Sequence, residues 1–277
     1  MMTFLLPTND PDTFYRHLYP TFDVLLPIKE SISFAINFQP PWTEEIADKV
    51  VLELRKKSFA VDCRFSRYTV EKRGEIPFNR IRYDCATLRP YSEVYALCDD
   101  DFEFREGADL MIREIITLFR RDSDLGVVQC YESPNLDKYY IKVEDPRKHA
   151  FFTSNGFFFR NLYANGKGDV LVYPYDALGL VGACEEFIIG LSLTERGHTL
   201  LKRTRSRIKH YRERFTLDEN QRYWGTDGIC FGKRGIFSYI KEKYGIDRKE
   251  VKRSESYRQT ENESQRHDRH GNRGGEC

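Results

Sequence analysis

Residues 32–65 read ISFAINFQPPWTEEIADKVVLELRKKSFAVDCRF. Apolar side chains alternate over residues 32–36, which predicts a strand, and the Pro-containing turn 37–41 ends it. Residues 42–57 carry apolar side chains at helical spacing behind an acidic first turn, which predicts a helix. Residues 60–65 predict a second strand. Because a strand–helix–strand unit almost always joins parallel strands by a right-handed crossover, this stretch predicts an α/β fold.

The alternation of strands and helices continues through the chain. Two short apolar runs before it, 3–6 and 24–28, are compatible with small strands. Downstream, we expect a helix ending near residue 90, a strand over 94–98, a helix over 107–121, strands over 125–130, 139–143, 157–160 and 168–173, and a helix over about 183–195. The part after residue 134 is therefore expected to be rich in strands.

The domain organisation follows from these patterns and from composition. Residues from 248 onward are almost devoid of apolar side chains and are expected to form a disordered tail, because they cannot bury enough surface to order themselves. The expected divisions are an N-terminal extension over 1–30, one α/β domain over 31–247 with a donor half over about 31–132 and an acceptor half over about 133–247, and the tail over 248–277.

Composition narrows the class of protein without naming its partner. The 277 residues are 40% hydrophobic and 31% charged, with a net charge of +1, as in an ordinary globular protein without a long-range field that would gather polyanions. The seven cysteines are scattered singly, which fits neither a disulfide framework nor a zinc site and suggests a reducing compartment. No basic leader and no transmembrane segment are visible, so we expect a cytoplasmic protein in a bacterial, viral or cytoplasmic setting.

Three aspartates follow the apolar strand 94–98 without an intervening turn. They are Asp99, Asp100 and Asp101, and they would stand at the carboxyl edge of a parallel sheet, where ligands bind in open α/β folds. Carboxylates at that edge can anchor a divalent cation, and the cation can neutralise a diphosphate as it leaves. A solvated acidic loop would explain the three aspartates taken alone about as well.

The context of the aspartates favours the ligand site. Residues 78–104, FNRIRYDCATLRPYSEVYALCDDDFEF, resemble the donor-site region of GT-A glycosyltransferases, in which an Asn-Arg pair begins a helix and a strand delivers a D-x-D motif. The resemblance implies a GT-A (Rossmann-like) fold, with a central mostly parallel sheet flanked by helices and a strand-rich acceptor half. It also implies a nucleotide-sugar donor, most closely a UDP-sugar, and Mn²⁺ or Mg²⁺. The residues it assigns to the donor are Asn79, Arg80, Asp99 and Asp100, and those it assigns to the metal are Asp99 and Asp101.

A second resemblance concerns residues 182–197, GACEEFIIGLSLTERG. They are similar to a segment of the family in which an acidic pair begins a helix and a glycine ends it. In inverting members the second acid takes the proton from the acceptor hydroxyl, so Glu186 is implied as the catalytic base, where the family more often has Asp. Without the resemblance, the acidic pair would only complement the helix dipole.

Two further site assignments rest on the same resemblance. Residues 206–211 resemble the segment in which many GT-A enzymes place a histidine as an additional metal ligand, which implies His210. Lys209 and Arg207 would then neutralise the departing diphosphate. The first strand of the family ends in a polar turn that contacts the base, and here Asn37 opens that turn, although the turn itself departs from the pattern of the family.

Two rival readings stay open at the level of sequence. A metal-dependent nucleotidyltransferase also uses paired aspartates, but it usually shows a Gly-rich phosphate loop near the first strand, and none is visible here. A nucleic-acid-binding module would use the stretch 202–214, which holds seven Lys or Arg residues in thirteen. The same stretch could instead guide a transferase to DNA, as in a phage that glycosylates modified bases. The acceptor, whether glycan, nucleic acid or small molecule, is not specified by the sequence.

Overall fold

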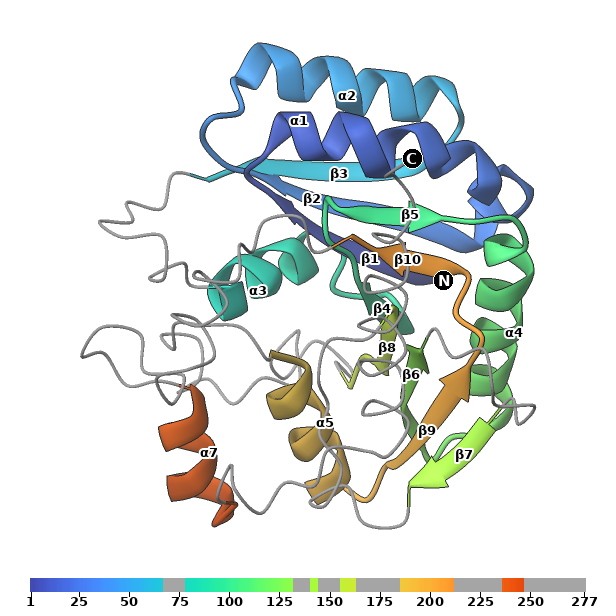
Figure 1. The fold of residues 1–277 in the computed structure, drawn as a ribbon, viewed down its shortest axis with the longest axis vertical. Helices are drawn as coiled ribbons and strands as arrows, with labels where there is room; N and C mark the ends of the chain where they lie inside the picture. Colours follow the sequence, from blue (N-terminus) through green and yellow to red (C-terminus); the bar gives the residue numbers. More distant parts are fainter. Residues whose placement is uncertain (67–77, 132–139, 144–154, 163–184, 212–235, 247–277) are drawn as a thin grey trace, which may run out of the picture.

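The computed structural model describes residues 1–66, 78–131, 140–143, 155–162, 185–211 and 236–246. An eight-stranded sheet with the order β3-β2-β1-β4-β8-β6-β9-β7 forms the centre of the molecule (Figure 1). Its strands are β1 (Met2–Thr8), β2 (Ile32–Phe38), β3 (Ala60–Phe65), β4 (Val94–Leu97), β6 (Leu125–Tyr131), β7 (Tyr140–Val143), β8 (Phe157–Arg160) and β9 (Thr199–Thr204). A separate two-stranded ribbon pairs β5 (Phe102–Phe104) with β10 (Ile208–His210).

The sheet is parallel at one side and mixed at the other. Strand β1 pairs in parallel with both β2 and β4, and β2 pairs in parallel with β3. Strand β8 runs antiparallel between β4 and β6, while β6 and β9 are again parallel and β7 closes the edge antiparallel to β9. The expectation of a mostly parallel central sheet with additional strands after residue 133 is confirmed.

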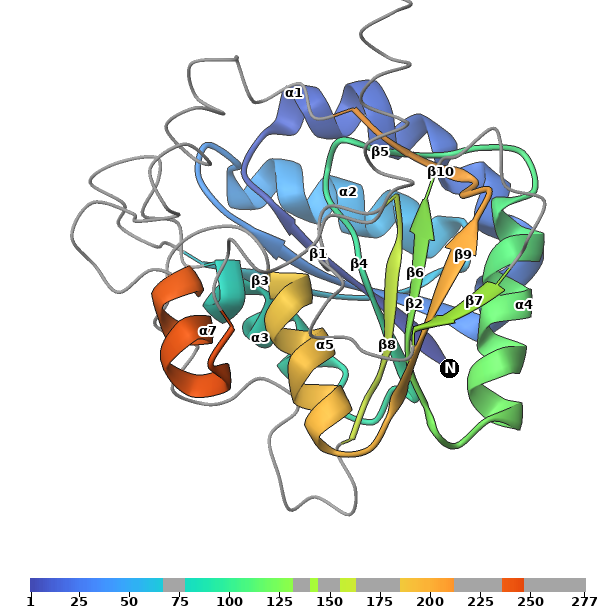
Figure 2. The same ribbon diagram turned by 60° about the horizontal axis from the view of Figure 1, so that its bottom comes forward.

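Helices cover both faces of the sheet, as Figure 2 shows. They are α1 (Pro11–Thr13), η1 (Phe14–Leu18), η2 (Tyr19–Ser31), α2 (Glu44–Lys56), α3 (Phe78–Leu88), α4 (Ala108–Arg121), α5 (Glu185–Glu195) and α7 (Ile236–Tyr244). One apolar core packs η1, η2, α2 and α4 against one face, and the other packs α3, α5 and α7 against the opposite face. The two sides of β1 enter different cores, with Phe4 in the first and Leu5 in the second. Among the described helices, none is long and apolar enough to cross a membrane.

The N-terminal residues require a correction. The sequence predicted 1–30 as an extension, but all seven residues of β1 are buried and lie between β2 and β4. The small strand expected over 3–6 is therefore present, but the local pattern did not show that it lies in the centre of the sheet. Pro7, which cannot donate a ladder hydrogen bond, is tolerated there as the second-last residue of β1. Residues 24–28, proposed as a small strand, belong instead to the helical segment η2.

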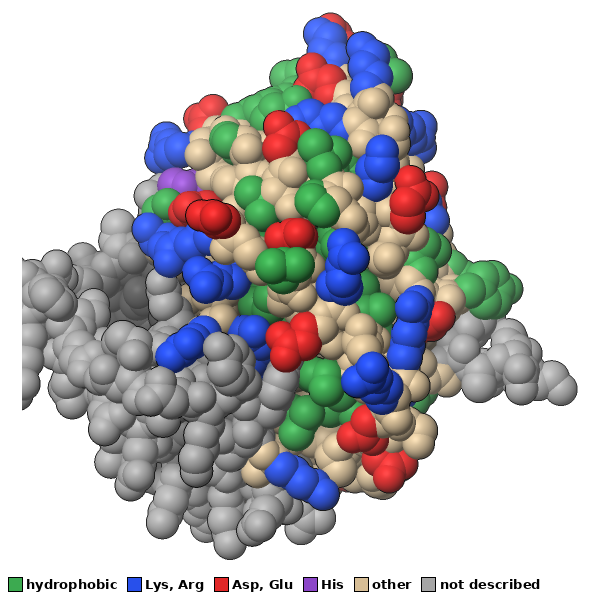
Figure 3. Space-filling model, turned by 90° about the vertical axis from the view of Figure 1, so that its right-hand side faces the viewer, with side chains coloured by type: hydrophobic (Ala, Val, Ile, Leu, Met, Phe, Trp, Pro, Cys, Tyr) green, Lys and Arg blue, Asp and Glu red, His purple; other side chains and the backbone are tan. Residues whose placement is uncertain are grey.

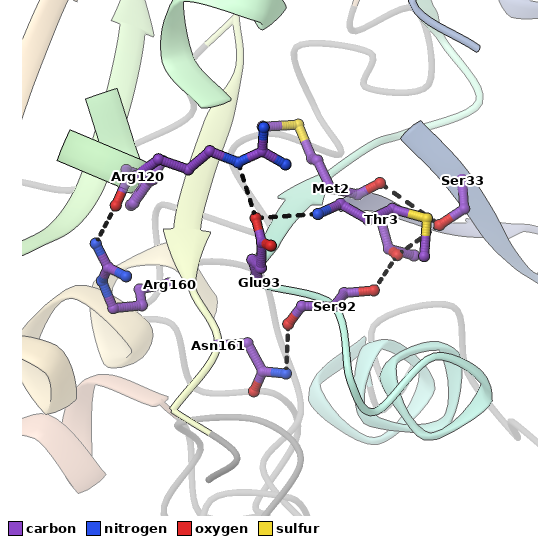
Figure 4. Close-up of polar contacts among 10 residues, drawn as sticks. Met2, Thr3, Ser33, Ser92, Glu93, Arg120, Arg160 and Asn161 are labelled. Atoms are coloured by element: carbon purple, nitrogen blue, oxygen red, sulfur yellow. Dashed lines mark hydrogen bonds and ion pairs between the residues drawn. The ribbon is translucent and has the colours of Figure 1, made fainter. Parts of the chain in front are cut away.

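The amino ends of the parallel strands are closed by polar contacts (Figure 4). The Thr3 hydroxyl is hydrogen-bonded to the hydroxyls of Ser33, at 2.7 Å, and of Ser92. The side-chain amide of Asn161 donates to the Ser92 carbonyl at 2.7 Å, and Glu93 forms an ion pair with Arg120 at 3.2 Å. These contacts join β1, β2 and β8 to the residues that enter β4. The aspartates lie at the opposite end of the sheet, where the parallel strands finish.

The remaining predicted elements agree with the structure within a few residues where the structure describes them. Helix α2 begins after Thr43, whose side chain accepts a hydrogen bond from the Ile46 amide, as an N-cap should. Gly107, in a left-handed conformation, immediately precedes α4. The predicted strand over 168–173 and the tail over 248–277 lie outside the described residues.

Candidate active site

Two neighbouring parallel strands end at the site. Strand β1 ends at Thr8, and β4 is followed by Asp99, Asp100 and Asp101 in the turn before β5. The helical segment after β1 packs on one face of the sheet, while α3, which precedes β4, packs on the other. This reversal of the face on which the connecting helices pack, between two adjacent parallel strands, opens the crevice in which α/β folds bind ligands.

The ribbon β5–β10 brings the predicted metal ligands together. His210 pairs with Phe102 across the ribbon, so its ring reaches the turn that carries the aspartates. His210 Nε2 lies 3.2 Å from Asp101 Oδ1 and 3.6 Å from Asp99 Oδ2, and one ligand atom from each residue falls within 4.8 Å of the others. The side chains of Asp101 and His210 are nearly buried, whereas 35% of the Asp99 side chain is exposed. Asp99 therefore forms the open side of the cluster.

The chemistry of this cluster fits a divalent cation. Two carboxylates and one imidazole offer oxygen and nitrogen ligands, which suit first-row divalent ions. The Cys98 thiol next to the cluster does not add a thiolate, because burial raises its pKa well above the ordinary value and the charge of Asp99 raises it further. The cluster is therefore a candidate site for Mn²⁺ or Mg²⁺ rather than a cysteine site.

Arg82 of α3 holds the base of the cluster. Arg82 is 1% exposed, and its guanidinium donates to the carbonyls of Leu5 and Cys98 and to Asp99 Oδ1. The same side chain thus joins the middle of β1 to the residue after β4 and fixes one oxygen of Asp99, while the other oxygen faces His210.

Asp100 is committed to a different network. Its Oδ2 accepts a 2.9 Å hydrogen bond from the Thr8 hydroxyl, whose oxygen accepts one from the Trp42 indole at 3.0 Å. Asp100 is 2% exposed and is not one of the three clustered ligand groups. The three aspartates therefore divide into two that face His210 and one that ties β1 to the turn.

The other predicted donor residues lie in different surroundings. Asn37 is fully buried at the end of β2, and neither its amide nitrogen nor its amide oxygen has a hydrogen-bond partner in the described structure. Arg80 is exposed and pairs with Asp84 at 3.2 Å, so the structure does not bring it to Asp99. Asn79 belongs to α3, but its side chain lies outside the described part.

Lys209 and Glu186 complete the predicted set. Lys209 pairs with Glu103 in the ribbon, and its Nζ lies 3.8 Å from the centre of the Tyr211 ring. Because neighbouring side chains of a strand point to opposite faces, Lys209 faces away from the side on which His210 meets the aspartates. Glu186 lies in the first turn of α5, half-buried, on the same face of the sheet as α3.

Sequence reasoning missed Thr8, Arg82 and Tyr211. A signal for Arg82 was present, because Cys85 and Ala86 follow it at helical spacing, are fully buried and mark the inward face of α3. Arg80 does not share that face. Nothing local marks Tyr211 or Thr8, whose roles depend on segments far away in the sequence.

Comparison with known proteins identifies the fold. No protein-family model matches the chain, and no curated protein sequence matches it. Among solved structures, GalNAc-T7 with UDP, GalNAc and Mn²⁺ has a TM-score of 0.51 at 13% identity, covering 76% of this chain and 43% of that one. Staphylococcus aureus TarS has a TM-score of 0.51 at 10% identity, covering 74% and 35%. The mannosyltransferase PcManGT from Pyrobaculum calidifontis, in complex with GDP-Man and Mn²⁺, has a TM-score of 0.46 at 11% identity, covering 74% and 56%.

The similarities to GalNAc-T7 and TarS define the class of fold. The chain has the GT-A fold of nucleotide-sugar glycosyltransferases, as the resemblance in the sequence implied. It spans between about a third and just over half of the length of these three structures.

Proposed function

We propose that this chain is a metal-dependent glycosyltransferase that moves a sugar from a nucleoside diphosphate, favoured here as a UDP-sugar, to an acceptor hydroxyl with inversion. The observation that carries the proposal is the Asp99, Asp101 and His210 cluster at the carboxyl end of β4. Its location at the reversal point of a GT-A sheet supports a role in donor binding. The presence of UDP, GalNAc and Mn²⁺ in the GalNAc-T7 structure is consistent with the same ligand chemistry.

In this proposal Asp99, Asp101 and His210 hold the divalent cation. When bound, the cation neutralises charge on the diphosphate as the bond to the sugar breaks. Arg82 keeps Asp99 oriented by occupying Oδ1, and the half-open position of Asp99 leaves the donor an approach to the cluster. Asp100 contributes indirectly by fixing the turn to Thr8.

Asn37 is the proposed contact to the nucleotide base. A buried amide without hydrogen bonds costs about 1–3 kcal/mol, and a base edge offers both the donor and the acceptor that the amide lacks. Asn79 remains a proposed neighbour of the nucleotide. Arg80 and Lys209 would have to leave the partners described above to reach a donor. We therefore propose that they contribute less to donor binding than the other predicted residues.

Glu186 is the proposed catalytic base. Its carboxylate would take the proton of the acceptor hydroxyl as that oxygen forms a bond to the anomeric carbon. The bond from this carbon to the diphosphate oxygen breaks in the same step, and the diphosphate leaves with the electron pair. Attack from the face opposite the diphosphate inverts the anomeric centre.

The basic stretch 202–214 does not favour a separate nucleic-acid-binding function in its described part. Arg203 is buried and pairs with Glu114 at 3.2 Å, and Lys209 packs on Tyr211. Across the side of the molecule that carries α4, Figure 3 shows basic side chains mixed with acidic and hydrophobic ones rather than a surface of one sign. A DNA acceptor therefore stays a prediction from the sequence.

A donor panel tests the proposed function. UDP-, GDP- and TDP-sugars are incubated with the protein, with Mn²⁺ or with EDTA, and slow hydrolysis of the donor is measured without an acceptor. We expect hydrolysis of one donor that requires the metal and is lost in Asp101→Asn. The matched control is Asp48→Asn on the exposed face of α2, which should behave as the wild type. Equal hydrolysis in EDTA, or an unaffected Asp101→Asn variant, would refute the metal-dependent reaction.

A further inference from the structure

Tyr211 is held by three separate parts of the molecule. Its ring stacks on His17 of η1 with the centroids 4.0 Å apart and the planes at 26°. Its hydroxyl donates to Glu103 Oε2 in β5, and its backbone amide donates to the Asp101 carbonyl at 3.1 Å. Residues that are far apart in the sequence therefore meet at one tyrosine.

The location of Tyr211 connects these contacts to the candidate metal site. It directly follows His210, and its amide bonds to the residue that supplies the carboxylate nearest to the His210 ring. The ribbon strand β10 has only three residues, so few ladder hydrogen bonds fix the orientation of its last residue. The contacts of Tyr211 add the restraint that such a short strand lacks.

The tyrosine and the histidine lie on different faces of the ribbon. Lys209 and Glu103 pair across the ribbon, and both contact Tyr211. His210 instead pairs with Phe102, and the centroids of these two rings lie 4.8 Å apart. The cluster of His17, Glu103, Lys209 and Tyr211, here called the Tyr211 clasp, is therefore adjacent to the metal ligands without contributing one.

We propose that Tyr211 is a positioning residue that sets the approach of His210 to Asp99 and Asp101, and that His17 extends this control to the N-terminal helical segment. The inference rests on the proposed metal site and adds a residue to which the resemblance to GT-A enzymes assigned no role. Contacts that orient a metal ligand strengthen its binding to the ion, and loss of such outer contacts typically weakens metal affinity by about 10–100-fold.

The test compares two tyrosines that each donate to a glutamate. Tyr211→Phe keeps the stacked ring but removes the hydrogen bond to Glu103. Tyr19→Phe removes the equivalent hydrogen bond to Glu53, on the side of the molecule formed by η2 and α2. Mn²⁺ alone is titrated into each full-length variant, with free Mn²⁺ followed by electron paramagnetic resonance and thermal unfolding recorded in parallel. We expect about tenfold weaker Mn²⁺ binding in Tyr211→Phe and wild-type binding in Tyr19→Phe.

Three more variants distinguish the positioning role from a purely structural effect. His17→Ala removes the other side of the stack and should also weaken Mn²⁺ binding, whereas Glu103→Gln retains an acceptor for the tyrosine hydroxyl and should restore most of the affinity lost in Glu103→Ala. Wild-type Mn²⁺ binding in both Tyr211→Phe and His17→Ala would overturn the positioning role alone. Absence of Mn²⁺ binding by the wild type would overturn the proposed metal site together with it.

Discussion

Thr8 Oγ1 donates a 2.9 Å hydrogen bond to Asp100 Oδ2, although 92 residues separate the two in the sequence. This contact joins the ends of β1 and β4 at the point where the candidate site opens. It also explains why the three consecutive aspartates have different contacts. Asp100 holds the turn in place, so Asp99 and Asp101 are presented to His210.

Thr8→Val should destabilise the protein. The substitution removes the donor to buried Asp100 and the acceptor for the Trp42 indole while keeping a β-branched side chain. Because buried polar groups that lose a partner cost about 1–3 kcal/mol, we expect a loss of that size in urea unfolding. Thr117→Val, which removes a hydroxyl bonded to a carbonyl of its own helix near the surface, should change the free energy by less than about 0.5 kcal/mol. Equal effects of the two would show that the Thr8 contact is unimportant.

Arg82→Met should be much more damaging than Arg80→Met. The first change leaves the carbonyls of Leu5 and Cys98 and the carboxylate of Asp99 without the guanidinium of Arg82, which is almost completely buried. We expect a loss of about 3–5 kcal/mol in the free energy of unfolding, as for other broken buried ion pairs. Arg80 itself is exposed, and its buried partner Asp84 keeps a second guanidinium in Arg64 at 3.5 Å, so we expect Arg80→Met to cost only about 0–1 kcal/mol. A stronger effect of Arg80→Met in chemical denaturation would contradict the structure of α3.

Glu186→Gln should separate chemistry from binding. If Glu186 takes the acceptor proton, the substitution should lower kcat by about 10²–10⁴-fold and leave the affinity for the donor nearly unchanged, because the interaction exists mainly in the transition state. Glu195→Gln, at the exposed end of the same helix, provides the control for changes in helix charge. Glu185→Gln should have a mild effect, because adjacent helical side chains point about 100° apart. Steady-state turnover together with calorimetry of donor binding would reveal the difference, and a mild effect of all three substitutions would place the base elsewhere.

Alkaline pH should destabilise the fold through its buried thiols. Burial raises the pKa values of Cys85 and Cys130 to about 12 and that of Cys98 well above the ordinary value of 9.0. The folded state therefore favours the protonated thiols. Their contribution is complete below pH 9 and falls as pH rises from about 9 toward 12, by about 1.4 kcal/mol per pH unit for each thiol that ionises only on unfolding.

Cys85→Ala provides the comparison for this effect. Urea unfolding at several pH values between 7.5 and 10.5 should show a shallower decline above pH 9 in the variant, because one thiol no longer ionises in the unfolded chain. Parallel curves for the variant and the wild type would exclude this contribution of Cys85.

The sequence by itself determined the local elements and the chemical type of the site. Period-two and helical patterns located β2, α2, β3 and α4 within a few residues, because an amphipathic element must repeat its apolar side chains with its own period. The apolar strand that runs into three aspartates indicated where charged ligands would gather. The resemblance of residues 78–104 and 182–197 to GT-A glycosyltransferases implied the GT-A fold, which the structural comparisons confirm.

Only the tertiary structure decided how distant segments meet. It placed β1 in the interior of the sheet, selected Arg82 rather than Arg80 as the guanidinium beneath Asp99, and paired β10 with β5 so that His210 reaches the aspartates. It also set Lys209 against Tyr211 on the other face of that ribbon. Strand partners and register are chosen by packing across the whole core, and a local pattern states which side of an element is apolar but not which element will cover it.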